Sequence, residues 1–192
     1  MTAGPLEDLD FTALAGPAAA ARAAQAATPR QREEALIGVQ SMESRGFHVV
    51  IARPAERLPP GNRHHVLIVE DDADTLALAA RALEKGGYVV FRATSAKDAG
   101  KVLAQMGVPH LVLLDVDLGD GTNGFAMLEK FRGHSRLKDL PVVMFTARCS
   151  VEDVTLGLQL GANGYVVKPV KPAVLLGAVD TVLKGRAGGD DA

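Results

Sequence analysis

The chain has 192 residues, of which 47% are hydrophobic and 23% charged, and its formal net charge is −2. These values fit an ordinary globular protein of one domain plus an appendage, or of two very small domains. They give no bulk electrostatic case for nucleic-acid binding, and no apolar run is long enough to span a bilayer. A single cysteine, Cys149, excludes an intramolecular disulfide. Acids at Glu7, Asp8 and Asp10 replace the basic start of a signal peptide, so we expect a cytoplasmic protein.

Residues 1–63 are expected to form an N-terminal extension and linker. Residues 18–27 are rich in alanine and have high helix propensity but no bulky apolar face. Residues 31–45 fit a second helix, residues 47–51 a lone strand, and the proline-containing residues 53–62 a linker. Three alternatives remain for this part: a dimerising helix pair, an element that docks a partner, or a disordered segment. We favour a partly helical interaction element.

Residues 64–186 alternate between strand and helix patterns and are expected to form one domain, with a disordered tail at 187–192. The apolar runs predict strands at 66–70, 88–92, 111–115, 142–146 and 164–168. Helices are expected at about 75–85, 96–106, 125–131, 151–160 and 172–183. Five strand–helix pairs of this length indicate an α/β fold, a parallel sheet with helices on both faces.

Four polar positions each close an apolar strand pattern. They are Glu70-Asp71-Asp72, Asp115, Thr146 and Lys168. In open parallel sheets, ligands bind just beyond the carboxyl ends of the strands. We therefore expect an acid cluster, a lone Asp, a hydroxyl and an ammonium to converge on one spot, which can hold a divalent cation and a phosphoryl group.

The acid cluster has two readings. Acids at a helix N-terminus cap the helix and complement its dipole, and Asp72 or Asp74 suits that role. Three adjacent carboxylates exceed what capping needs, and they repel one another unless a cation lies among them. Mg²⁺ prefers one or two carboxylates, water and phosphate oxygens, so Asp71 with Glu70 beside it fits a Mg²⁺ site.

The other three positions are ambiguous when taken singly. Asp115 fits a nucleophilic carboxylate that forms an acyl phosphate, and equally an acid that caps the next turn. Thr146 fits a donor to a phosphoryl oxygen or a strand-end hydroxyl bonded to backbone. Lys168 fits a charge-neutralising ammonium or a solvated surface residue. A cis bond from Lys168 to Pro169 would aim that ammonium inward.

Together these residues resemble the receiver domain of two-component response regulators, over about Val66 to Leu183. The segments that carry the resemblance are Val66 to Asp72, Leu113-Leu114-Asp115, Phe145-Thr146-Ala147, Gly161 to Tyr165, and Lys168-Pro169. The resemblance implies a flavodoxin-like sheet in the order 2-1-3-4-5. It also implies Mg²⁺-dependent phosphorylation of Asp115 by a histidine kinase or a phosphotransfer protein. The backbone carbonyl of Asp117 would be a further metal ligand.

One stretch departs from the family pattern. Residues 118–124 lack the usual proline and contain one extra residue, so we expect a more flexible loop above the site. Asp117 and Arg148 each lie two residues beyond a site residue, where an opposite-charge pair would shield an acyl phosphate from water. Two solvated charges without effect are the alternative, and the phosphoryl lifetime stays open.

The resemblance also implies a switch in which Thr146 moves inward on phosphorylation and Tyr165 rotates into the released space. Val154, Leu158, Val174 and Val179 fit either the switched surface or the core. The sequence shows no DNA-binding module after the last helix, so we expect output through a protein target, by relay to another histidine, or through the N-terminal segment, with a homodimer as a further option. We expect no direct contact with nucleic acid or membrane.

Two rival functions remain. Asp115-Val116-Asp117 loosely resembles the motif of haloacid dehalogenase-type phosphatases, but two strands precede it and the acid cluster stays unexplained. A degenerate receiver that only docks a partner is the other rival, and the full set of Asp71, Asp115, Thr146 and Lys168 argues against it. We expect a phosphoacceptor and not a turnover enzyme.

Overall fold

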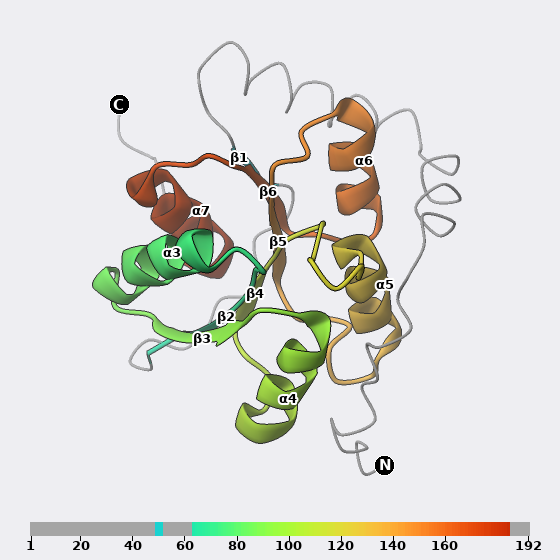
Figure 1. Cartoon of the computed structure of the whole chain (residues 1–192), viewed down its shortest axis with the longest axis horizontal. Coiled ribbons are helices and arrows are strands. Elements are labelled where there is room, and N and C mark those ends of the chain that lie inside the picture. The colour runs from blue at the N-terminus through green and yellow to red at the C-terminus, as the bar shows by residue number, and fades with distance from the viewer. Residues whose placement is uncertain (1–48, 52–62, 185–192) are drawn as a thin grey trace.

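The computed structural model describes residues 49–51 and 63–184 (Figure 1). The strands are β1 (Val49–Ile51), β2 (His65–Val69), β3 (Val89–Ala93), β4 (Leu111–Leu114), β5 (Val142–Thr146) and β6 (Gly164–Val167). The helices are α3 (Ala73–Lys85), α4 (Ala96–Met106), α5 (Gly124–Gly133), α6 (Val151–Gln159) and α7 (Pro172–Lys184). All five predicted strands and all five predicted helices of the second part are confirmed, with ends that differ by a few residues. The two helices expected before residue 46 lie outside the described residues.

The sheet has the order β1-β6-β5-β4-β2-β3. The strands from β2 to β6 pair in parallel, which confirms the predicted order of five parallel strands. β1 adds a sixth strand that pairs antiparallel with β6, with Val50 opposite Tyr165. The strand expected near residues 47–51 therefore exists over 49–51, but it is not a lone strand. Unpaired N–H and C=O groups of the edge strand β6 favour pairing with a further strand. The strand propensity of residues 47–51 does not by itself indicate which strand they pair with.

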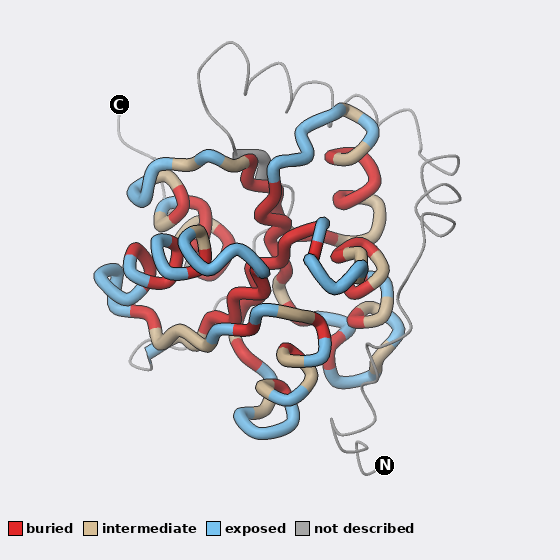
Figure 2. The backbone as a smooth tube through the Cα atoms, in the orientation of Figure 1, coloured by how far each residue is buried: buried red, intermediate tan, exposed pale blue. Residues whose placement is uncertain are grey.

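Helices cover both faces of the sheet. α3 and α7 lie on one face, and α4, α5 and α6 lie on the other (Figure 1). Alternate residues along each strand point to opposite faces of the sheet. Leu67 and Val69 therefore pack in one hydrophobic cluster, and Val66 and Ile68 pack in the other. The buried tube segments in Figure 2 run through the middle of the sheet and along the inner sides of the helices.

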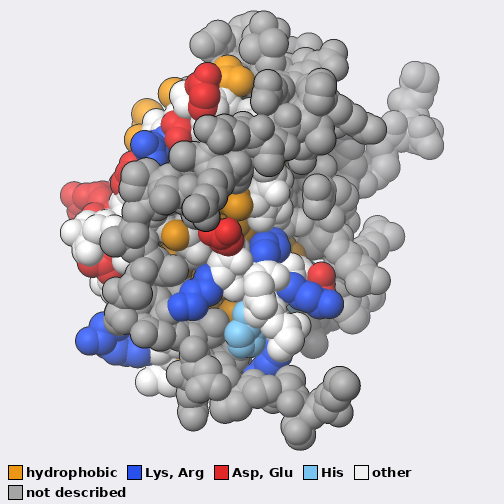
Figure 3. Space-filling model, turned by 90° about the vertical axis from the view of Figure 1, so that its right-hand side faces the viewer, with side chains coloured by type: hydrophobic (Ala, Val, Ile, Leu, Met, Phe, Trp, Pro, Cys, Tyr) orange, Lys and Arg blue, Asp and Glu red, His pale blue; other side chains and the backbone are white. Residues whose placement is uncertain are grey.

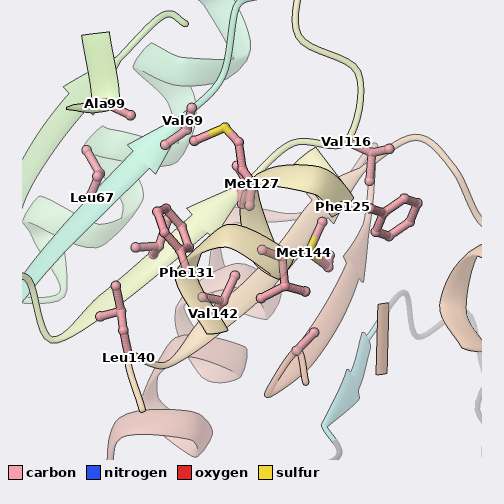
Figure 4. Packing of buried hydrophobic residues seen from close by; sticks show 14 of the residues in the cluster. Leu67, Val69, Ala99, Val116, Phe125, Met127, Phe131, Leu140, Val142 and Met144 are labelled. Carbon is pink, nitrogen blue, oxygen red and sulfur yellow. The ribbon is translucent and has the colours of Figure 1, made fainter. Parts of the chain in front are cut away.

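The core is aliphatic with a few aromatic rings. On the α4–α6 side, Phe125, Met127 and Phe131 of α5 pack over Val142 and Met144 of β5 (Figure 4). Val154, Leu158 and Val179 are buried, so they belong to the core, and Val174 is half-buried. This resolves three of the four positions that the sequence left between core and surface.

Polar side chains cap the starts of three helices. Asp72 caps α3 by accepting a hydrogen bond from the Thr75 N–H at 2.8 Å, which decides between Asp72 and Asp74. Ser95 caps α4 in the same way, and Ser150 accepts from the Asp153 N–H at the start of α6. These caps satisfy backbone donors that the first helical turn leaves free. Among the described residues, no helix combines the length and apolarity that a membrane span requires.

Candidate functional site

The candidate site lies at the carboxyl ends of β2, β4, β5 and β6. Glu70 follows β2, Asp115 follows β4, Thr146 ends β5 and Lys168 follows β6. Since the four strands are parallel and adjacent, their carboxyl ends meet at one edge of the sheet. Glu70, Asp115 and Thr146 are buried, whereas Asp71 is exposed.

The Lys168 ammonium lies between two carboxylates. Its Nζ donates to Glu70 Oε2 at 2.5 Å and to Asp115 Oδ2 at 2.6 Å. The same Nζ lies 5.0 Å from the centre of the Phe145 ring. The Lys168–Pro169 peptide bond is cis. The alternative interpretation of Lys168 as a solvated surface residue is wrong, because its side chain is only 16% exposed and forms ion pairs with both Glu70 and Asp115.

The surroundings shift the pKa values of this cluster. Burial raises the pKa of the Glu70 carboxyl above its ordinary value, and the nearby Lys168 only partly offsets that effect. Burial alone would lower the pKa of Lys168, but its hydrogen bonds to Asp115 and Glu70 outweigh burial and raise it. The ammonium therefore stays charged and neutralises part of the negative charge of the site.

Three acidic side chains converge here. Carboxylate oxygens of Glu70, Asp71 and Asp115 all lie within 4.8 Å of one another. Hard divalent cations take oxygen ligands of this kind. Glu70 and Asp115 are buried and Asp71 is exposed, so one side of the pocket faces solvent and is open to further ligands. The acidic pocket therefore can bind a metal ion.

The Asp115 carboxylate is held from the backbone side as well. Its Oδ1 accepts from the N–H groups of Val116 at 2.6 Å and Asp117 at 3.4 Å. Thr146, which ends β5, accepts from the Arg148 N–H at 3.3 Å through its Oγ1. The hydroxyl hydrogen of Thr146 is thus free to point elsewhere in the site.

The loop after Asp115 is closed by hydrogen bonds. Asp117 forms a β-bridge with Asn123, and the Leu118 N–H donates to the Thr122 carbonyl at 3.2 Å. Gly121 takes a positive φ of 81°, which suits glycine. Residues 118–122 therefore form a tight turn, and the extra residue expected relative to the family pattern stays a prediction. The greater flexibility that we expected for the loop stays a prediction.

The sequence did not predict that two glycines near the site, Gly119 and Gly124, lie in close contact with other residues. A Cβ on Gly124 would lie 2.0 Å from the Asp115 carbonyl oxygen, and one on Gly119 would lie 2.7 Å from Asp71 Oδ2. Gly124 begins α5 directly after its cap, Asn123. The Asn123-Gly124 pair is the sequence signal at this place. It indicates a turn, but it does not indicate that the Asp115 backbone lies close to Gly124.

Asp117 and Arg148 flank the mouth of the site. Arg148 Nη1 lies 3.7 Å from Asp117 Oδ1, and Arg148 Nε lies 3.6 Å from Asp153 Oδ1. The Arg148 side chain is 42% exposed and that of Asp117 is 69% exposed. The predicted opposite-charge neighbours therefore lie close together, in an exposed pair that ordinarily stabilises little.

Tyr165, the aromatic residue of β6, is fully buried. Burial raises the pKa of its phenol above the ordinary value. Among the described residues, no group accepts or donates a hydrogen bond at its hydroxyl. The ring therefore already occupies an inner position in this structure.

A pocket of about 410 Å³ opens beside the site on the α3 side. Leu78 and Ala82 of α3 line it together with Phe145, Val170 and Leu175. Leu78, which helps to line this pocket, is 64% exposed. An apolar surface thus lies directly next to the Lys168 ammonium.

A family model described as the response regulator receiver domain matches residues 66–180, more than half of the chain. The chain belongs to the response-regulator receiver family. This membership leaves no specific observation in favour of the haloacid dehalogenase rival. Asp115 also follows the central strand β4, not the first strand of the sheet as that rival requires.

Curated relatives and solved structures agree with the assignment. The chain is 39% identical over 131 residues to the transcriptional regulatory protein CseB of Streptomyces coelicolor, covering 66% of this chain and 53% of that protein. It is 33% identical over 125 residues to the phosphate regulon regulatory protein PhoB of Pseudomonas aeruginosa, covering 65% and 54%. The chain thus spans about half the length of the curated relatives it matches.

Two receiver structures show the same fold. A putative response regulator from Chloroflexus aurantiacus superposes with a TM-score of 0.58 at 31% identity, covering 63% of this chain and 98% of that one. The chemotaxis protein CheY4 of Vibrio cholerae gives 0.58 at 29% identity, covering 64% and 100%. Receiver proteins of this kind are response regulators of two-component signalling.

Proposed function

We propose that this chain is the phosphoacceptor of a two-component pathway, which takes a phosphoryl group from a phosphohistidine onto Asp115. One observation carries the proposal. The Asp115 carboxylate lies at the carboxyl end of β4, 2.6 Å from the Lys168 ammonium and beside Glu70 and Asp71. A nucleophile, a cation and a pair of further acids are what phosphoryl transfer requires.

In the proposed reaction, a carboxylate oxygen of Asp115 attacks phosphorus. A P–O bond to Asp115 forms, the P–N bond to the donor imidazole breaks, and the released imidazole nitrogen takes up a proton. Lys168 neutralises charge on the phosphoryl oxygens, and the Thr146 hydroxyl donates to one of them. Water later hydrolyses the acyl phosphate, so the chain assists its own modification and does not turn over as an enzyme.

Mg²⁺ is the metal that we propose for the acidic pocket. Asp71, Asp115 and the carbonyl of Asp117 would bind it, with Glu70 beside them. The convergence of three carboxylates within 4.8 Å fits a hard cation that keeps several water ligands. When bound, the metal supplies neutralisation of the phosphoryl oxygens.

Intact mass after incubation with Mg²⁺ and acetyl phosphate tests the proposal. We expect the gain of one phosphoryl group in the wild type, its absence in Asp115→Asn, and its absence when Mg²⁺ is removed. A folded wild type that gains no mass with acetyl phosphate, phosphoramidate or a kinase would refute the phosphoacceptor role. That result would favour the docking-module alternative.

The output is proposed to be a change of protein contacts. Thr146 and Tyr165 would act as the switch pair, and the surface of β5, α6, β6 and α7 would be read by a downstream protein or by a second copy of the chain. On the side of the molecule seen in Figure 3, charged side chains of both signs are interspersed among the described residues. The formal net charge of −2 gives no bulk electrostatic case for nucleic-acid binding, so protein contact is the proposed route. The cytoplasm, where histidine kinases present their phosphohistidine, is the proposed location.

A further inference from the structure

The buried position of Tyr165 depends on the shape of its surroundings. The ring is 0% exposed and packs in the core between the sheet and α6. Its hydroxyl has no hydrogen-bond partner among the described residues. A buried polar group without a partner disfavours the state that buries it. Packing around the ring must therefore compensate.

Gly157 provides the space on the α6 side. It is a buried residue inside α6, where a glycine is intrinsically less favourable than an alanine. A Cβ at Gly157 would lie 3.1 Å from Tyr165 Cε2 and 3.2 Å from Cδ2. It would also lie 3.4 Å from Met144 Cγ, a fully buried residue of β5. Contacts of 3.1 Å are tighter than carbon atoms normally make, so the Tyr165 ring would have to move by a few tenths of an ångström to admit a methyl group, and its present position becomes less favourable.

We propose that Gly157 is a positioning residue of the switch, whose missing side chain admits the Tyr165 ring to its buried position. A methyl group at this place biases the chain towards the state with the ring outside. The inference rests on the proposed function, in which the position of Tyr165 is coupled to the phosphoryl group on Asp115. Because such coupling is reciprocal for binding equilibria, a bias against the buried ring weakens the binding of a phosphoryl mimic.

Gly157→Ala tests the proposal, with Gly177→Ala in α7 as the matched control. Gly177 is also a helical glycine, but a Cβ there would meet nothing within 4 Å. The chain has only two tyrosines, so NMR resonances of the Tyr165 ring can be followed directly. We expect Gly157→Ala to expose the ring and to weaken beryllium fluoride binding in Mg²⁺ by about tenfold, a coupling of ordinary size. Gly177→Ala is expected to leave both readouts unchanged.

Repeating Gly157→Ala in a variant that lacks the Tyr165 ring shows whether the effect on beryllium fluoride binding depends on that ring. Tyr165→Val introduces a β-branched residue, a type that strands favour, and removes the two ring atoms that the methyl group would meet. In this background Gly157→Ala should no longer change beryllium fluoride binding. If Gly157→Ala alone fails to fold, recovery of the fold in the double variant supports the proposal, and continued failure contradicts it.

Two results would overturn the proposal. One is a Gly157→Ala variant that keeps the Tyr165 ring buried and binds beryllium fluoride like the wild type. The other is an equal loss of binding with and without the Tyr165 ring. If the wild type itself binds no beryllium fluoride and accepts no phosphoryl group, the proposed function fails. The NMR position of the ring then still decides whether Gly157 admits it.

Discussion

The two carboxylate oxygens of Asp115 have different partners. Oδ1 accepts from two backbone N–H groups, and Oδ2 accepts from the Lys168 ammonium. The backbone partners are fixed by the chain direction after β4, whereas a lysine side chain has several rotatable bonds. Lys168 is thus the partner that can move from the carboxylate to an incoming phosphoryl group.

Arg148→Ala is predicted to change the autodephosphorylation rate of the acyl phosphate several-fold. The guanidinium lies 3.7 Å from Asp117 at the mouth of the site, where it can obstruct water. The rate is measured by following the loss of the phosphoryl mass after the donor is removed. Arg92→Ala is the control, because it breaks another exposed pair, with Glu84 at 2.7 Å, away from the site. Equal rates in the wild type and Arg148→Ala would show that the pair does not shield the phosphoryl group.

Gly124→Ala is predicted to destabilise the fold by about 1–3 kcal/mol, the usual cost of overpacking. Its Cβ would lie 2.0 Å from the Asp115 carbonyl oxygen, a backbone atom that cannot turn away like a side chain. Urea denaturation measures the change in the free energy of unfolding. Gly133→Ala, at the other end of α5 with open space around its Cβ, is expected to lose little or nothing. A Gly124→Ala variant as stable as Gly133→Ala would contradict the close approach.

At the scale of elements, β1 joins the extension to the strand that carries Tyr165. Val50 lies opposite Tyr165 in the antiparallel register, and β1 covers the edge that β6 would otherwise expose. Residues before the domain predicted at 64–186 therefore contribute to its sheet. The boundary near residue 63 stays a prediction.

Val50→Pro is predicted to release β1, because proline cannot donate to a ladder and disrupts pairing. Hydrogen exchange should become at least tenfold faster at those amides of residues 164–166 that face β1. Amides in β2 and β4, in the middle of the sheet, should keep their protection. Val50→Thr, which retains a β-branched residue, is the matched control. Unchanged exchange in Val50→Pro would exclude a stable β1–β6 pairing in solution.

The α3 side of the site carries an exposed apolar pocket that Leu78 helps to line. Leu78→Ser is predicted to slow transfer from a phosphorylated histidine kinase by about tenfold to a hundredfold, since burying a leucine in an interface is worth roughly 1.5–3 kcal/mol. Modification by acetyl phosphate, which needs no protein interface, should not change. Met106→Ser on α4 removes a similarly exposed apolar side chain on the other face and serves as the control. Equal slowing by both substitutions, or by neither, would reject the pocket as a docking surface.

At the scale of the whole molecule, the two ends of the sheet differ in chemistry. The acidic site lies at the carboxyl ends of the strands, while His64, His65 and His110 gather where β2 and β4 begin. The His65 N–H donates to Nδ1 of His110 at 2.8 Å, which requires that this nitrogen carry no proton. Burial, and then the neighbouring His65 and His64, lower the pKa of His110 below its ordinary value.

The fold is therefore predicted to lose stability as the pH falls below about 6.5, the ordinary histidine pKa. In that range the unfolded chain binds a proton that folded His110 does not, so the free energy of unfolding decreases until the pH passes the folded pKa. Urea denaturation at pH 8 and pH 5 measures the loss. His110→Asn keeps an acceptor for the His65 N–H without the titration, and its stability should depend less on pH. The groups facing His110 are the rings of His64 and His65, with Tyr88 next to His64. An identical pH dependence in the variant would place the titration elsewhere.

Much of the fold could be read from local patterns. Apolar runs of four or five residues gave the elements their type and order, and Asp72 was one of the two caps that the sequence offered for α3. The site residues were recognisable because each one closes a strand, and parallel strands bring their carboxyl ends to one edge. Contacts between side chains were not accessible in this way, because they depend on rotamers and on distances between elements far apart in the chain.

The sequence by itself determined the five strand–helix pairs, the positions of Glu70, Asp71, Asp115, Thr146 and Lys168, and through them the family. Periodicity and capping are local properties, and they suffice for this. Only the tertiary structure decided that β1 completes the sheet, that Lys168 pairs with both Glu70 and Asp115, and that Gly157 makes room for Tyr165. These features arise where surfaces from separate elements meet, and packing selects among partners that the sequence leaves equivalent.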